Sequence, residues 1–278
     1  NKHLWDCQLC VLCWINAGGE GLMIIKEQGA PELGQVTFSD IKAAIYKGWC
    51  DMRRAPAYGV IVASICVAFG FLLGWITMAT GKSYWLVFAA VGFPLFGPFT
   101  AVALYEVSHR LDYGLPLVFS EIFGVVRHQA ARQLPSLCVI ILMVFLFWFF
   151  IAHMIFALFL GLSTMTNVSS SLEVYFTADG LTMLAVGTAV GGLFALLLFM
   201  ITVFAMPMLL DREVDFVTAM IASFIAVKSN LVLMVLWGAF IAICTFAAMV
   251  PAFLGLYLVL PLFGHASWHL YRASEARA

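Results

Sequence analysis

The chain has 278 residues, of which 64% are hydrophobic and only 10% are charged, and its mean hydropathy is +1.03. Soluble domains carry about 25% charged residues and roughly 45–50% apolar ones, so the composition excludes an ordinary soluble domain and indicates a membrane protein. The 14 Lys and Arg residues nearly balance the 15 Asp and Glu residues, and net charge therefore gives no sign of a nucleic-acid partner.

Apolar stretches long enough to cross a bilayer begin after a polar N-terminal segment at 1–35. A span needs about 20 apolar residues, and we expect a membrane domain at 36–272 followed by a cytoplasmic tail at 273–278. The expected spans lie at about 57–80, 84–105, 134–160, 181–210, 230–250 and 251–271.

Prolines modify two of these spans. Pro94 and Pro98 predict that the second span is kinked or broken. Residues 231–264 carry no charge and would form a helix of about 50 Å, too long for one crossing and short for two. Pro251, near the middle of this stretch, predicts a hairpin.

The distribution of basic residues predicts the orientation. If the polar segments before the first span and after every second span share one side, only Lys82 of the 14 Lys and Arg residues falls on the other side. Basic residues concentrate on the cytoplasmic side of membrane proteins. We therefore expect both termini in the cytoplasm and an even number of spans.

Three segments that precede the hairpins resemble one another. Residues 37–41 (Thr-Phe-Ser-Asp-Ile) are echoed by 118–122 (Val-Phe-Ser-Glu-Ile) and, more faintly, by 215–219 (Asp-Phe-Val-Thr-Ala). Each opens an amphipathic pattern with apolar residues at steps of three and four. In the first, the apolar face consists of Phe38, Ile41, Ile45, Trp49 and Met52. We predict an all-α polytopic membrane protein whose six transmembrane helices form three repeated units, each an interfacial amphipathic helix plus a two-helix hairpin.

Charged and histidine side chains recur at the cytoplasmic ends of the second helix of each hairpin. They are Glu106, His109, Arg110, Asp211, Arg212, His269 and Arg272. We predict that these residues, the cytoplasmic collar, converge around a shared centre, where opposite charges pair across the bundle. A structural use is favoured over a substrate or proton site, because no charge lies at mid-bilayer.

Catalytic and metal-binding patterns are weak. His153 is the only histidine deep in an expected span, whereas a haem–copper centre needs several. Cys7, Cys10 and Cys13 lack the fourth cysteine of an iron–sulfur run.

His265 and His269 share a helical face and are weak candidates for metal ligands, but the interpretation of this segment as a membrane-surface anchor is favoured. The chain carries none of the usual catalytic signatures, and we expect no enzyme activity, metal or cofactor.

Several longer motifs carry a resemblance to a known family. They are Arg54-Ala55-Pro56-Ala57-Tyr58-Gly59, Gly97-Pro98, Tyr105-Glu106-Val107-Ser108-His109-Arg110, Pro207-Met208-Leu209-Leu210-Asp211-Arg212 and the run from Pro261 to Arg272 (PLFGHASWHLYR). In this order the chain resembles bacterial six-helix integral membrane proteins catalogued as a domain of unknown function, some members of which are labelled cytochrome c oxidase subunits. The resemblance spans about 36–272. It implies a bacterial inner membrane and a setting among respiratory complexes, but no established activity.

Three functional hypotheses remain. The first is a non-catalytic accessory or scaffold protein that packs against a larger membrane complex, because 25 Phe and 13 Met residues supply adaptable apolar surface. The second is a passive small-solute transporter or a lipid-handling protein. The third and weakest is haem or metal handling through His109, His265 and His269. The expected partners are membrane lipids and another integral membrane complex, with no nucleic acid.

Overall fold

The computed structural model describes residues 28–81, 85–161 and 172–277, with the backbone alone at 85–96 and 172–173. The described chain is helical, as predicted. Its elements are α2 (Phe38–Arg54), α3 (Pro56–Thr80), α4 (Trp85–Asp112), α5 (Phe119–Ala130), α6 (Leu134–Leu160), the short 3-10 helix η2 (Leu172–Phe176), α7 (Ala178–Thr202), α8 (Ala205–Asp211), α9 (Phe216–Ser229), α10 (Leu231–Met249) and α11 (Leu256–Glu275).

The three related segments do open helices. Before α2, the Thr37 side chain accepts a hydrogen bond from the Asp40 amide, and the Asp40 carboxylate accepts one from the Thr37 amide in return, which is a capping box. The Asp215 carboxylate caps α9 through the Thr218 amide. α5 starts after Val118 without a side-chain cap. A short helix followed by a pair of long helices thus recurs along the described chain.

Four stretches of the described residues are long and apolar enough to cross a membrane. They are Pro56–Thr80, Leu134–Leu160, Ala178–Asp211 and Leu231–Met249. These stretches coincide with the first, third, fourth and fifth predicted spans, so the protein is an integral membrane protein by length and composition.

The other two predicted spans are not among these four. The second, at 84–105, lies largely in α4, which runs without interruption through Pro94 and Pro98, so the helix is not broken there. The sixth, at 251–271, falls on a turn and on α11. α11 is less apolar than the spans because it carries two histidines, which are buried, and Arg272 and Glu275, which are partly exposed.

The predicted hairpin at Pro251 is present. α10 ends at Met249, and α11 begins at Leu256 after a tight turn. The turn requires a glycine, because a Cβ at Gly255 would lie 2.6 Å from the Cα of Ala248.

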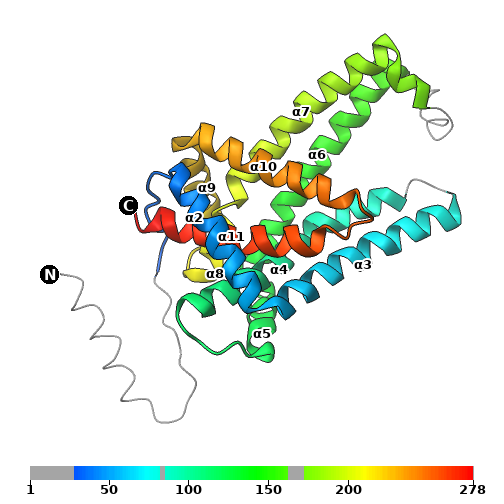
Figure 1. Cartoon of the computed structure of the whole chain (residues 1–278). Coiled ribbons are helices and arrows are strands. Elements are labelled where there is room, and N and C mark those ends of the chain that lie inside the picture. Colours follow the sequence, from blue (N-terminus) through cyan, green and yellow to red (C-terminus); the bar gives the residue numbers. More distant parts are fainter. Residues whose placement is uncertain (1–27, 82–84, 162–171, 278) are drawn as a thin grey trace, which may run out of the picture.

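The helix pairs α3–α4, α6–α7 and α10–α11 extend away from the region in which α2, α8, α9 and the C-terminus gather (Figure 1). The largest cluster of buried apolar residues draws on α2, α8, α9 and α11 and on the adjoining ends of α4 and α6. The core therefore lies at one end of the helix pairs, and their far halves are more exposed.

α11 lies at the centre of this core, where it contacts α2, α3, α4, α8 and α10, and it packs most extensively against α2. The two helices approach closely at Gly48, where a Cβ would lie 2.8 Å from the amide nitrogen of Ala266. The buried face of α2 is Ile41, Ala44, Gly48 and Asp51. Of the face predicted from its apolar residues, Ile41 is buried and Ile45 packs against the core, whereas Phe38 and Trp49 are exposed. The packed face is thus rotated towards Ala44 and Gly48, whose small side chains permit the close crossing.

α7 and α8 are two parts of one broken helix. Between them, the Phe204 amide donates a hydrogen bond to the Ser223 hydroxyl at 3.1 Å, and that hydroxyl donates to the Met200 carbonyl at 2.8 Å. Ser223 is fully buried in α9. It thus satisfies backbone groups that the break leaves without helical partners and fixes α9 against the break.

Candidate functional site: a buried polar cluster on α11

Four polar residues from three helices form a hydrogen-bonded chain inside the core. Asp51, in the last turn of α2, accepts a hydrogen bond from the Ser108 hydroxyl of α4 at 2.8 Å, and its Oδ2 lies 2.7 Å from Nε2 of His269. Nδ1 of His265 lies 2.8 Å from the same hydroxyl. One consistent arrangement has His265 donating to Ser108, and Ser108 and His269 both donating to Asp51. We call these four residues the Asp51 cluster.

Local structure places these side chains. His265 and His269 are four residues apart and share one face of α11, as their spacing predicts. Asp51 follows Gly48 by three residues, so the close crossing of α2 and α11 brings its carboxylate against that face. All members of the cluster are buried.

The cluster stabilises a buried charge. Burial by itself raises the pKa of Asp51, but the hydrogen bond and charge of His269 and the hydrogen bond of Ser108 outweigh it and hold that pKa below its ordinary value. The carboxylate is therefore ionised at neutral pH. A buried ion needs such partners, because desolvation would otherwise return it to the neutral form.

A second layer of contacts surrounds the Asp51 cluster. Asp112, at the end of α4, accepts a hydrogen bond from the Trp268 indole at 2.9 Å and lies 3.6 Å from Nδ1 of His269. Asp211, at the end of α8, accepts a hydrogen bond from the Tyr271 hydroxyl at 3.0 Å. Side chains of α11 thus reach the ends of both α4 and α8.

Charged pairs complete this layer around the last turns of α11. Arg272 lies 3.5 Å from Asp211, and it also pairs with Glu275 on its own helix. Glu275 pairs in addition with Arg212. This chain of ion pairs joins α8 to the end of α11.

A separate ion-pair group lies on α4. The Glu106 carboxylate accepts a hydrogen bond from Nε of Arg110 at 2.6 Å and lies 3.4 Å from Nδ1 of His109. Arg110 also pairs with Glu121 of α5. Burial raises the pKa of Glu106, but His109 and Arg110 together hold it below its ordinary value. The His109 ring packs edge-on against Trp268, with 5.3 Å between the centroids.

The structure brings the seven residues of the predicted cytoplasmic collar to one end of the helix pairs, in three groups rather than one ring. Glu106, His109 and Arg110 belong to the α4 group, His269 to the Asp51 cluster, and the others to the ion pairs around Glu275. Asp211 contacts Tyr271 and Arg272, and the adjacent Arg212 pairs with Glu275.

Sequence reasoning did not identify Asp51 and Ser108, the residues that connect the cluster. The spacing of Asp51 could have identified it, because Asp51 follows Ala44 and Gly48 at helical intervals and therefore lies on the same buried face of α2. Ser108 lies within the quoted motif at 105–110, but nothing in its spacing marks it as a partner of Asp51.

The geometry is that of a buried clamp between α2, α4 and α11, in which Ser108 and His265 have no exposed surface. Both candidate metal ligands face this cluster, His265 towards Ser108 and His269 towards Asp51. Within the described residues no three His, Cys, Asp or Glu side chains are grouped to hold a metal ion. Cys7, Cys10 and Cys13 lie outside the described residues.

Comparison with known proteins supports the membrane assignment. The family described as predicted integral membrane protein (DUF2189) matches residues 86–211, which extend from α4 to the end of α8. Two of the quoted motifs, at 97–98 and 105–110, lie inside that segment, as does nearly all of the motif at 207–212. No curated protein and no solved structure matches the chain. The family's description names no oxidase, and the chain is thus similar, over this central segment, to a family of integral membrane proteins catalogued as a domain of unknown function.

Proposed function

We propose that this protein is a non-catalytic accessory or scaffold subunit of a bacterial inner-membrane complex. In this proposal a cytoplasmic core carries three attached helix pairs. The helix pair α6–α7 would be the part that packs against transmembrane helices of the partner complex. The observation that carries the proposal is the exposure of α6. Only 6% of the residues in its most apolar stretch are buried, compared with 33% for α3.

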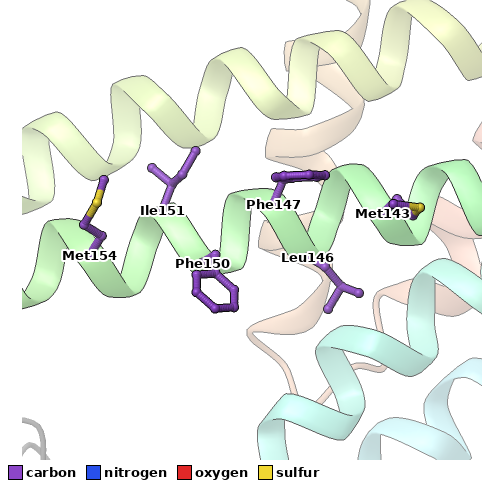
Figure 2. Close-up of a pocket in the computed structure, with 6 residues that line it drawn as sticks. All are labelled: Met143, Leu146, Phe147, Phe150, Ile151 and Met154. Carbon is purple, nitrogen blue, oxygen red and sulfur yellow. The ribbon is translucent and has the colours of Figure 1, made fainter.

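The exposed part of α6 offers a groove. Its first half packs into the core through Leu134, Leu137, Cys138 and Ile141. Beyond this, one face of the helix lines an open depression of about 490 Å³, and Figure 2 shows the side chains that line it. The lining residues are Met143, Leu146, Phe147, Phe150, Ile151 and Met154.

The chemistry of this groove suits a helical partner. Its described lining is entirely apolar, and Met and Phe side chains adapt to irregular apolar surfaces and are enriched in protein interfaces. Phe150, at 80% exposure, would anchor such a contact.

The proposed topology has six spans in three repeated units, with both termini in the cytoplasm. Contacts between the two ends of the described chain support an even number of crossings. The Gly34 amide donates to the Ser274 carbonyl at 2.9 Å, and Arg277 forms an ion pair with Asp40 at 2.8 Å. The ends of α4 and α8 meet α11 at the same place.

Site-specific photo-crosslinking tests the docking role in native membranes. A photoreactive residue at position 150 of α6 should crosslink to one defined membrane protein, and the triple variant F147A/F150A/M154A should lose co-purification of that protein in mild detergent. The matched control is V232A/I243A/F246A on α10, whose side chains are equally exposed. The proposal fails if position 150 crosslinks only to lipid, or if both triple variants retain the partner equally.

The alternative is a lipid-handling protein or a passive transporter. A cavity between the helix pairs favours the lipid-handling form of this alternative over a solute path, because its walls are largely apolar.

A further inference from the structure

A second cavity, here called the central cavity, lies where the three helix pairs meet. It has a volume of about 420 Å³ and is lined by residues of α3, α4, α6, α7, α8, α10 and α11. Val259 and Ser267 both line it, so it extends for about 12 Å along α11. Its size falls in the range of small-molecule sites, which are typically about 300–1,000 Å³.

The polar groups of the central cavity are few and neutral. No charged side chain is among the described residues that line it. The hydroxyls of Thr100 and Thr245 donate to carbonyls of their own helices, those of Gly97 and Ile241, each at 2.7 Å.

Two further hydroxyls lack such a bond. Within the described part of the chain, neither the Tyr105 hydroxyl nor the Ser267 hydroxyl has a hydrogen-bond partner. Tyr105 is only 7% exposed and lines the cavity. An unpaired hydroxyl in an apolar setting costs roughly 1–3 kcal/mol, so a ligand that accepts hydrogen bonds from both side chains would be favoured here.

Tyr105 and Ser267 belong to the same end of the cavity, where α4 and α11 contact each other through Ser108 and His265 and through His109 and Trp268. Tyr105 directly precedes Glu106 of the α4 ion-pair group, and Ser267 directly precedes Trp268, whose indole donates a hydrogen bond to Asp112. The other end, near Val259, has apolar walls. A molecule with one polar end and an apolar body matches this division, and a charged molecule does not.

We propose that the central cavity binds a neutral lipophilic molecule that carries a carbonyl group, to which Tyr105 and Ser267 donate hydrogen bonds. A quinone-type ring and the ester end of a neutral lipid share this chemistry. The site goes beyond the docking role, since it lies between the helix pairs and not on the exposed face of α6.

Binding is tested with a matched pair of probes on the full chain in lipid nanodiscs. The ketone 2-acetylnaphthalene should bind saturably above the background of empty nanodiscs. Its isostere 2-isopropylnaphthalene, which lacks the carbonyl, should bind at least tenfold more weakly. Y105F and S267A remove only a hydroxyl, and each should weaken ketone binding about five- to tenfold. Y46F changes a tyrosine that is exposed on α2 and should have no effect.

A spectroscopic readout separates hydrogen bonding from a change in fold. The infrared carbonyl band of the bound, 13C-labelled ketone should lie at lower frequency than in lipid alone and return towards the lipid value in Y105F/S267A. Filling the cavity through Ala101→Leu should reduce occupancy, since Ala101 lines it. Equal affinity for the two probes, or an unshifted band in the unaltered protein, would overturn the proposal.

Extraction of the purified protein with organic solvent distinguishes the two classes of natural ligand, a quinone and a neutral lipid. Mass spectrometry of organic extracts should show a molecule that the purified protein retains and Y105F/S267A loses. A retained quinone would identify one source and a retained neutral glyceride the other. Equal retention of every extracted lipid by the protein and the double variant would contradict the site.

Discussion

Nε2 of His269 lies 2.7 Å from Oδ2 of Asp51, although 218 residues separate them in the chain. The contact joins the first described helix to the last, and through Ser108 it reaches α4 as well. The core of this membrane protein is thus connected by a buried ion and its hydrogen bonds at the point where small residues let α2 and α11 cross.

Removing either partner of this contact should destabilise the protein. D51A or H269A should each cost about 3 kcal/mol, because one partner is left buried without the other. The double variant should cost less than the sum. The measurement is thermal unfolding of the detergent-solubilised protein. E213Q, which alters the exposed pair with Arg132, should change stability little, and additivity of D51A with H269A would contradict the coupling.

Arg212 and Glu275 should form a coupled pair. Arg212→Ala and Glu275→Ala should each lower stability by about 1–2 kcal/mol, because both side chains are partly buried and ion-paired. A double-mutant cycle on thermal stability measures the coupling. If either single variant kept full stability and yet abolished co-purification of a partner, the cluster would serve binding and not folding.

Gly48→Ala should destabilise the protein, although alanine is the better helix former. A Cβ there would lie 2.8 Å from a backbone nitrogen and 3.0 Å from a backbone oxygen of α11, and backbone atoms cannot move aside cheaply. Gly124→Ala in α5 is the matched control, since a Cβ there meets nothing within 4 Å. It should stabilise by up to about 1 kcal/mol. Thermal unfolding of the two variants should show opposite signs.

Acid should destabilise the core. The pKa values of Asp51 and Glu106 lie below the ordinary values of 3.8 and 4.5 in the folded protein. Their contribution is therefore fully present above about pH 5 and is lost as pH falls below those values towards the folded pKa values. Thermal stability measured from pH 7 to pH 3 should decline in this range, and D51N/E106Q should flatten the decline. An unchanged profile in the double variant would assign the acid sensitivity to other groups.

Single cysteines in a variant without native cysteines should report the topology. Residues 82 and 173 should react with a membrane-impermeant thiol reagent from outside intact cells, and residues 112 and 213 only after permeabilisation. The expectation follows from the concentration of basic residues on the cytoplasmic side. Labelling of 173 and 213 from the same side would show that α7–α8 does not cross, and the three-unit repeat would fall with it.

The sequence by itself determined where the helices lie and which of them are apolar. The absence of charge over long stretches located α3, α6, α7 and α10, and Pro251 located the turn between α10 and α11. These features are local, because helix length, proline position and capping residues act within a few residues of the chain.

Tertiary structure alone decided which faces meet and which charges pair. In a membrane span both the lipid-facing and the protein-facing side chains are apolar, so hydropathy does not identify the packed face. On α2 the packed face was set by the small residues Ala44 and Gly48 together with Ile41, and not by Phe38 and Trp49. Asp51, Ser108 and His269 meet only because the close crossing of α2 and α11 beside α4 excludes water and leaves these polar groups to satisfy one another.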